Sequence, residues 1–383
     1  AHPSVPKGRG RHTRRSRRAA AGTPVGPEGP RQAHPSVPKG RGRHNAPMHP
    51  ARPLPALDGL RGVAALLVVL AHAANHDLGP SLLEGAGRHG VFLFFVLSSF
   101  LLTRQLLEPA LAPGGLAGWC AWAARRLRRV LPGYLAAALA YAALDGWSQQ
   151  RLLGHLTLTE SWFHLWTIPV ELQAYLALPL VALAHGLLGR RRERTALLLA
   201  LAIVGTRLAF PPDYASGFPP FLPVFLTGSL LACLPEERLR AAGGMGWIGV
   251  LAFAALLPGL HAVALDAPLE RMRFHLQFEA FTAGAAALLV AGASDSGALT
   301  RVLASAPLRA VGRLSYSLYL LHMLVLARVL EFGTGLGESV AWLLYLAMSL
   351  SLAFASERLV ERPLRARSSG PISSSSPATP PGS

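Results

Sequence analysis

Long apolar runs constrain the fold of this chain more than any other feature. From about residue 55 to residue 360, apolar segments of roughly 17 to 21 residues alternate with short polar stretches. A helix of about 20 apolar residues crosses the hydrocarbon core of a bilayer and bonds its backbone polar groups internally. With 51% hydrophobic and 15% charged residues, the composition is that of a polytopic membrane protein.

The apolar runs predict an all-α bundle with about ten transmembrane helices. Their expected positions are 56–75, 89–107, 128–145, 168–188, 195–211, 219–235, 245–265, 275–293, 313–331 and 338–358. Positively charged residues accumulate in short cytosolic loops. Arginine clusters at 125–129 and 190–194 lie in the second and fourth connections, so an even number of helices with both termini in the cytosol fits the sequence best.

The two ends of the chain differ in composition from the part between them. Residues 1–54 are rich in Pro, Gly and Arg, contain no Phe, Trp or Tyr, and repeat residues 1–12 without change at 33–44. We predict a disordered basic tail at 1–54, a membrane domain at 55–366 and a disordered Ser/Pro tail at 367–383. The basic tail is expected to meet anionic lipid headgroups, and no nucleic acid partner is expected because stacking side chains are missing.

Arg61 and His72 form the first candidate site, because both lie on the first predicted span. Eleven residues at about 100° and about 1.5 Å each return to nearly the same helix face about 16 Å farther along. Ionisable side chains inside a membrane helix are costly and are therefore a functional hypothesis. Two alternatives are a histidine that only faces the headgroups, and a signal peptide ending near residues 71–73, which the long basic segment before it disfavours.

The predicted topology sorts the other polar residues by depth. Arg61 and the arginines at 125–129 are expected at the inner face. His72 and Glu171 are expected at the outer face, where they could meet. The ninth span would bring Ser315 and Tyr316 upward from the inner side and place His322 at mid-depth. The result would be two polar layers within one helix bundle.

Each layer suits one half of a group transfer. Paired arginines hold phosphates through forked, charge-assisted hydrogen bonds, as a nucleotide-bearing acyl donor requires. A histidine removes a proton from a hydroxyl near neutral pH, and a carboxylate bonded to its other nitrogen fixes the tautomer and stabilises the cation.

Six blocks of sequence resemble, in order, the recurrent blocks of the acyltransferase type 3 family of integral membrane acyltransferases. They are LDGLRGVAALLVVLAH, VFLFFVLSSFLLT, RRLRRVLPGY, WTIPVELQAY, RLSYSLYLLH and ERP, and they span roughly residues 55–366. Members of this family move acetyl or other short acyl groups from acyl-CoA to hydroxyls of cell-surface glycans, lipids or small molecules. The resemblance implies roles for residues that match the family elements: Arg61, His72, Arg125, Arg126, Glu171, Ser315 and Tyr316.

The sequence also departs from the family pattern. Ser98-Ser99-Phe100 stands where Ser-Gly-Phe is usual, Leu172 replaces a second acid after Glu171, and Ala174 replaces an aromatic residue. These changes are expected to tighten one helix contact and to alter the acceptor's surroundings near the fourth span.

The resulting prediction is a membrane O-acyltransferase of the bacterial inner membrane. His72 and Glu171 are the predicted catalytic residues, and a brief acyl-histidine also fits. The predicted substrate- and donor-binding residues are Arg61, Asp58, Arg125, Arg126, Ser98, Ser315, Tyr316 and His322. No metal or bound cofactor is expected, and acyl-CoA, in particular acetyl-CoA, is the expected co-substrate. Expected partners are this donor, a hydroxyl-bearing surface glycan or its lipid-linked precursor, and membrane lipids.

Simpler interpretations compete with several of these assignments. His322 is more often a packing residue, and Ser98 and Ser99 can merely bond within or between helices. The arginines at 190–194 are expected to be a topology signal only. The rival function is a non-enzymatic transporter or flippase, which would be favoured by inverted repeats with broken helices.

Overall fold

The computed structural model describes residues 54–108, 115–159, 163–212, 217–258, 260, 274–294, 297–333 and 335–363. The predicted tails fall almost entirely outside these residues, so their disorder stays a prediction. All described residues belong to the compact unit that begins at Pro53.

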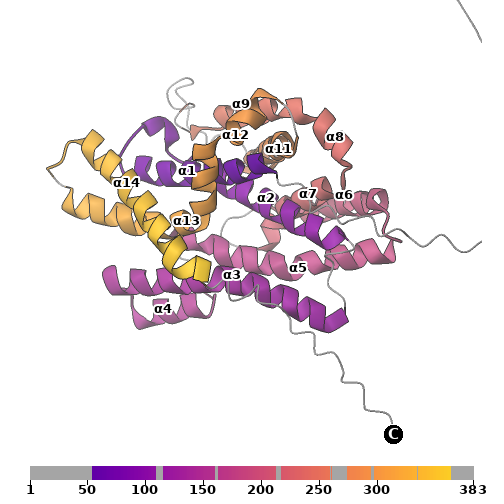
Figure 1. The fold of residues 1–383 in the computed structure, drawn as a ribbon, viewed down its shortest axis with the longest axis horizontal. Helices are drawn as coiled ribbons and strands as arrows, with labels where there is room; N and C mark the ends of the chain where they lie inside the picture. The colour runs from indigo at the N-terminus through magenta and orange to yellow at the C-terminus, as the bar shows by residue number, and fades with distance from the viewer. Residues whose placement is uncertain are drawn as a thin grey trace, which may run out of the picture. The chain divides into compact units, whose positions relative to one another are not determined.

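All elements of the described part of the chain are helices (Figure 1). The long ones are α1 (Pro55–Ala74), α2 (Gly87–Leu107), α3 (Gly115–Leu144), α5 (Thr167–Leu187), α6 (Arg192–Ala209), α11 (Phe274–Ala293), α13 (Ala306–Phe332) and α14 (Glu338–Ser356). The shorter α-helices are α4 (Gln149–Leu156), α7 (Leu222–Cys233), α8 (Glu236–Ala241), α9 (Gly246–Ala255) and α12 (Ala298–Leu303). Short 3-10 turns η1 (Ser81–Leu83), η2 (Phe163–Trp166), η3 (Pro219–Phe221) and η4 (Gly243–Met245) precede α2, α5, α7 and α9, and a π-helical turn η6 (Glu357–Glu361) continues α14.

The all-α prediction is confirmed for the described residues, whereas the count of ten spans stays a prediction. Five helices in the described part are long and apolar enough to cross a membrane: α1, α2, α5 with η2, α13, and α14 with η6. Three shorter apolar helices cover 219–233, 243–255 and 277–293. The side of the membrane on which the termini lie is likewise a prediction.

The second predicted connection is mostly helical, which corrects the expected start of the third span at 128. Helix α3 begins at Gly115 and runs without interruption through the arginines at 125–129. Between Leu116 and Leu131 only Gly118 is a poor helix former, since the rest of that stretch is Ala, Leu, Arg, Trp, Cys and Val. The arginines therefore project from a helix rather than from a loop, and their position along it decides which of them face inward.

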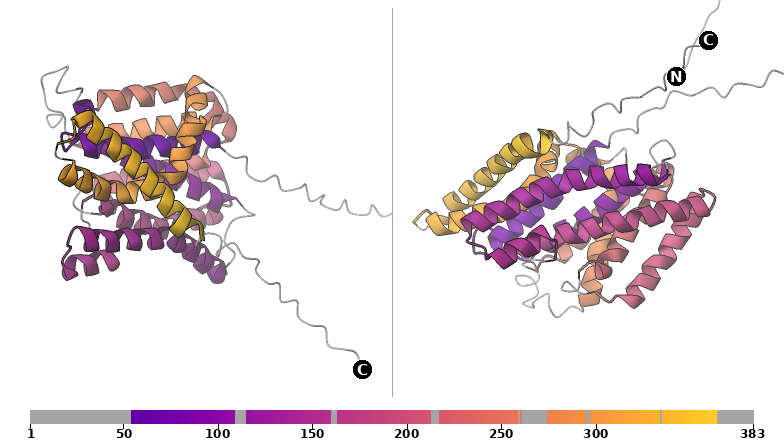
Figure 2. Two further views of the ribbon diagram at one scale, coloured as in Figure 1. Left: turned by 60° about the vertical axis from the view of Figure 1, so that its left-hand side comes forward. Right: turned by 90° about the horizontal axis from the view of Figure 1, so that it is seen from below.

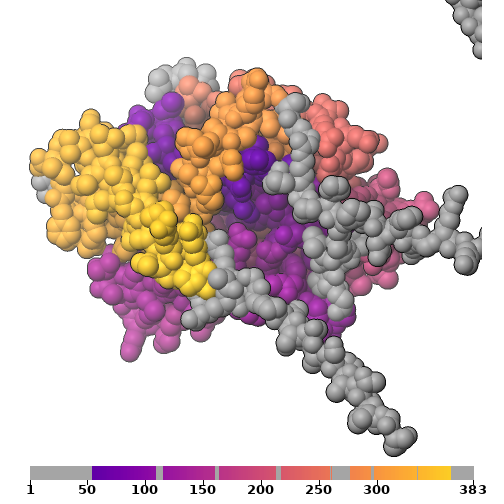
Figure 3. Space-filling view, viewed as in Figure 1, coloured from indigo at the N-terminus to yellow at the C-terminus, as the bar shows by residue number. Residues whose placement is uncertain are grey.

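Helices α1, α2 and α13 form the interior of the bundle. More than half of each spanning segment is buried, whereas most of α14 is accessible. In the space-filling view α14 presents a broad yellow surface and little of the indigo α1 is visible (Figure 3). On α5 the exposed residues Leu176, Leu180, Leu183 and Leu187 recur every three or four positions. Such an apolar stripe suits contact with lipid tails.

Contacts between helices fix the relative directions of two pairs of helices. Helix α2 runs antiparallel to α1, because Gly87 lies beside His72 and Gly90 lies beside Ala64. Helix α3 runs parallel to α13, because Tyr141 bonds to the backbone at Leu320 and Asp145 pairs with Arg328 at 2.8 Å. The long helices accordingly lie side by side (Figure 2).

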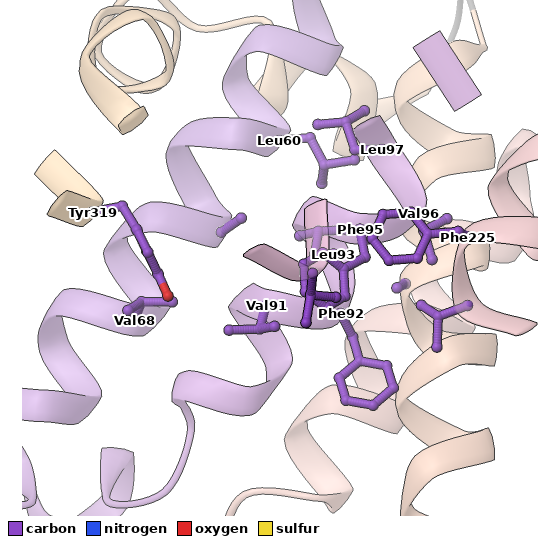
Figure 4. Close-up of a cluster of buried hydrophobic side chains, with 14 of the residues drawn as sticks. Leu60, Val68, Val91, Phe92, Leu93, Phe95, Val96, Leu97, Phe225 and Tyr319 are labelled. Carbon is purple, nitrogen blue, oxygen red and sulfur yellow. The ribbon is translucent and has the colours of Figure 1, made fainter. Parts of the chain in front are cut away.

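Aromatic side chains fill the contact between α2, α7 and α11. Phe95 stacks on Phe225 with ring centroids 4.7 Å apart, and Phe92 meets Phe278 edge-on at 4.6 Å. Figure 4 shows Phe92, Phe95 and Phe225 in this cluster and Tyr319 beside Val68 on the other side of it. Burial of these large rings stabilises the helix positions that the polar residues depend on.

Glycines bring α1 and α13 into backbone contact. A Cβ at Gly312 would lie 1.8 Å from the Asp58 carbonyl oxygen, and one at Gly62 would lie 2.3 Å from the Leu308 oxygen. Small residues permit this approach between membrane helices. Ten residues after these glycines, on parallel helices, lie His72 and His322.

Candidate active site

Three histidines from distant parts of the sequence meet at one level of the bundle. His72 on α1, His322 on α13 and His164 on η2 form what we call the histidine cluster. The His72 and His322 rings have centroids 5.0 Å apart, and Nδ1 of His72 lies 3.3 Å from Nε2 of His322. The His164 ring lies 5.0 Å from that of His322 and 6.2 Å from that of His72.

The members of the histidine cluster differ in accessibility. His322 is fully buried and His164 is 4% exposed, whereas His72 is only partly buried. Among the described residues no three metal-ligating side chains could hold a metal ion. Ring nitrogens of all three histidines lie near backbone carbonyl oxygens, those of Val68, Leu320 and Tyr319.

Tyrosines and a threonine hold the histidine cluster in place. The Tyr319 hydroxyl donates to the His164 carbonyl and accepts from Thr167 at 2.8 Å. The Tyr141 hydroxyl donates to the Leu320 carbonyl at 3.0 Å and lies 3.4 Å from His164 Nε2. These bonds tie η2 to α3 and α13, so the position of His164 does not depend on its own helix alone.

A second polar group, which we call the arginine–glutamate cluster, lies toward the other end of α1. Glu171 accepts hydrogen bonds from Ser98 at 3.1 Å and from Tyr175 at 2.6 Å. Arg61 is within electrostatic range of Glu171, Tyr175 and Arg129. The cluster therefore joins α1, α2, α5 and α3.

The expected contact between His72 and Glu171 is wrong. Glu171 bonds to Ser98, which lies eleven residues along α2 from Gly87, the neighbour of His72. That separation is about 16 Å, so Glu171 is level with Arg61. The cause is the entry of the chain into α5: η2 already lies at the level of His72, and Glu171 follows His164 by seven residues, about two turns farther along.

The arginines of α3 differ in how closely they approach the arginine–glutamate cluster. Arg126 stacks over Trp122 at 5.8 Å and donates to the Gln105 side chain, while Arg125 is exposed. Arg129 is exposed as well, but it acts electrostatically on both Arg61 and Arg126. Arg126 and Arg129, three residues apart on one helix face, therefore approach the arginine–glutamate cluster, and of the two arginines that the family resemblance indicated only Arg126 does so closely.

Of the remaining predicted site residues, Asp58 and Tyr316 lie near the arginine–glutamate cluster. Asp58 pairs loosely with Arg61 at 4.0 Å, and the Tyr316 hydroxyl donates to the Val130 carbonyl of α3. Ser315 is buried in α13. His322, which was expected at mid-depth, lies beside His72, and its role in substrate binding stays a prediction.

Sequence reasoning missed His164 and Tyr175 as site residues and considered Arg129 only as part of a cluster. His164 precedes the predicted start of the fourth span and looked like a loop residue. A usable signal was the position of His164 within FHLW, directly before the TIPVE block, since Phe, Leu and Trp are mostly buried and keep a neighbouring residue close to the core. For Tyr175 the signal was its i+4 spacing from Glu171 on one helix.

Fold and site together define a helical membrane protein that holds two clusters of ionisable side chains inside its bundle. The chain belongs to the acyltransferase family whose sequence profile, described as an acyltransferase domain, matches residues 54–358. This confirms the resemblance noted in the sequence.

Curated relatives agree with the family assignment. The chain is 24% identical over 366 residues to the O-acetyltransferase OatA of Staphylococcus aureus strain NCTC 8325 / PS 47, covering 83% of this chain and 58% of the relative. The same values hold for OatA of strains COL and MRSA252. The chain thus spans little more than half the length of these relatives. No solved structure matches it.

Proposed function

We propose that this protein is a membrane O-acyltransferase that moves an acetyl or other short acyl group from acyl-CoA to a hydroxyl of a glycan, lipid or small molecule. The observation that carries the proposal is the separation of the two clusters by about 16 Å along α1. In coenzyme A a long pantetheine arm separates the phosphates from the thioester. Guanidinium groups at one level and a histidine at the other match the two ends of such a donor.

In the proposed reaction His72 acts as the general base. It takes the proton of the acceptor hydroxyl as the oxygen attacks the thioester carbonyl, so that a C–O bond forms and the C–S bond breaks. The coenzyme A thiolate leaves and receives the proton from the imidazolium. Arg61, Arg126 and Arg129 would hold the donor phosphates, and Glu171, held by hydrogen bonds from Tyr175 and Ser98, would position these cations by its charge. The proposed location is the bacterial inner membrane, with the donor entering from the cytosol.

The test is the release of coenzyme A thiol from acetyl-CoA by purified protein in lipid nanodiscs, with glycan fragments as acceptor. His72→Ala is expected to lower the rate at least about 10²-fold, the usual contribution of a general base. His76→Ala is the matched control, since His76 lies four residues away and is exposed. Equal rates for His72→Ala and the wild-type protein would refute the base assignment.

Binding of the acyl donor can be measured separately from the transfer reaction. Arg61→Ala is expected to weaken binding of a non-hydrolysable thioether analogue of acetyl-CoA about tenfold or more, because a charge-assisted bond is lost. His72→Ala is expected to bind the analogue as tightly as the wild-type protein. Unchanged binding to Arg61→Ala would move the donor site elsewhere.

A further inference from the structure

The hydrogen positions on His322 follow from its neighbours. This ring is fully buried, and its Nδ1 lies 2.7 Å from the Tyr319 carbonyl oxygen and 3.1 Å from that of Leu318. Carbonyl oxygens only accept hydrogen bonds, so Nδ1 of His322 carries the hydrogen. In a neutral imidazole the other nitrogen, Nε2, then presents a lone pair.

That lone pair faces His72. Nε2 of His322 lies 3.3 Å from Nδ1 of His72, and the same Nδ1 lies 2.8 Å from the Val68 carbonyl oxygen. Both neighbours of Nδ1 are acceptors, so Nδ1 of His72 carries a hydrogen that they share. The lone pair of neutral His72 is therefore on Nε2, the nitrogen on the far side of the ring from His322.

We propose that His322 is a positioning residue that holds His72 in the tautomer with a basic Nε2. This inference rests on the proposed function, in which His72 is the general base, and it names the residue that fixes the tautomer of that base. His322 takes the place of the carboxylate that was expected beside His72, because Glu171 belongs to the arginine–glutamate cluster. The Val68 carbonyl accepts from the same Nδ1 within α1, and His322 is the acceptor that ties the His72 ring to a second helix.

A neutral imidazole is suited to this role inside a membrane. The aspartate of a Ser-His-Asp triad fixes the tautomer of its histidine and stabilises the imidazolium. A charged carboxylate at this depth would be costly when the base is neutral. When His72 takes the hydroxyl proton at Nε2, its Nδ1–H becomes a charge-assisted donor to His322, and that bond strengthens in the transition state. His322 itself neither gains nor loses a proton.

The kinetic experiment compares His322→Gln with His322→Leu in nanodiscs. Glutamine offers an amide oxygen that can accept from His72, whereas leucine fills space without an acceptor. His322→Leu is expected to lower kcat about 10²-fold or more, with the KM for acetyl-CoA changed less than about twofold, and His322→Gln is expected to stay within about tenfold of the wild-type kcat. His89→Leu is the matched control, since His89 is also fully buried in a spanning helix and bonded to two backbone carbonyls; it should leave kcat per folded molecule unchanged.

A second experiment reads the tautomer without turnover. Solid-state NMR of 15N-histidine-labelled protein in lipid, with the His72 signals identified by their loss in His72→Gln, reports which nitrogen carries the hydrogen. Nδ1–H is expected in the wild-type protein, and a larger share of the Nε2–H tautomer in His322→Leu than in His322→Gln, because in the leucine variant only the Val68 carbonyl still accepts from Nδ1. A wild-type signal from Nε2–H would overturn the inference, as would equal kcat losses in His322→Leu and His322→Gln. If acetyl transfer itself is absent while the Nδ1–H signal is present, the proposed function fails and the tautomer assignment stands.

Discussion

Gly312→Ala tests whether the histidine pair depends on the close contact of α1 and α13. An added Cβ would lie 1.8 Å from the Asp58 carbonyl oxygen, whereas ordinary contact begins at 3.4 Å. The obstructing atom belongs to the backbone, so no side chain can rotate away. The two helices must therefore separate locally by about 1.6 Å to relieve the clash.

This separation has two expected consequences. Over-packing of a tight contact costs about 1–3 kcal/mol of stability. If α13 moves as a rigid rod, the distance between Nδ1 of His72 and Nε2 of His322 grows from 3.3 Å to about 4.9 Å, beyond hydrogen-bond range. Displacements of about 1 Å near a reacting group cost up to about 10² in rate, so acetyl transfer per folded molecule should fall about ten- to a hundredfold.

The assay combines thermal unfolding in nanodiscs with the rate of coenzyme A release. Gly205→Ala is the control, because a Cβ at this helical position of α6 would meet no atom within 4 Å. Alanine there should leave the rate unchanged and stabilise the helix by up to about 1 kcal/mol. A Gly312→Ala protein with wild-type rate and wild-type melting temperature would refute the argument that backbone contact positions the histidines.

Two further predictions concern other parts of the bundle. Gly228→Ala would place a Cβ 2.0 Å from the Ser99 hydroxyl oxygen and should destabilise the protein by about 1–3 kcal/mol, whereas Ser99→Gly combined with Gly228→Ala should recover part of this loss in thermal unfolding. Arg129→Ala should weaken binding of the thioether analogue about tenfold, and Arg125→Ala should weaken it less, because Arg129 acts electrostatically on Arg61; equal effects of the two substitutions would remove the distinction between Arg125 and Arg129.

The spanning helices were predictable from sequence because the bilayer fixes their length. The predicted span at 89–107 is helix α2 at Gly87–Leu107, and the one at 338–358 is α14 at Glu338–Ser356. In each case the apolar run ends at a segment that contains Gly, Pro or charged residues. The same reasoning failed at α3, where helix propensity alone extends the helix beyond the apolar part, and a hydropathy argument does not detect that extension.

The site was predictable only where one helix determines it. The stripe of Arg61 and His72 follows from the period of α1 and needs no knowledge of its neighbours. The level of Glu171 depends on how the chain enters α5. Counting residues from the end of the apolar run estimates this level only if the helix begins at the membrane surface. Helix α5 begins below that level, since η2 already provides His164 to the histidine cluster.

The pairing of His72 with His322 required information that the sequence contains in two separate places. Each histidine follows a glycine by ten residues, Gly62 on α1 and Gly312 on α13, and the two glycines meet at their backbones. Ten residues rise about 15 Å, so the histidines reach the same level only if the helices run in the same direction. The arginine distribution predicts that direction, because it makes both helices odd-numbered spans. The charge pattern predicts the helix directions, and the glycines predict the close approach of the two helices. Together they predict a contact between His72 and His322 that neither feature indicates alone.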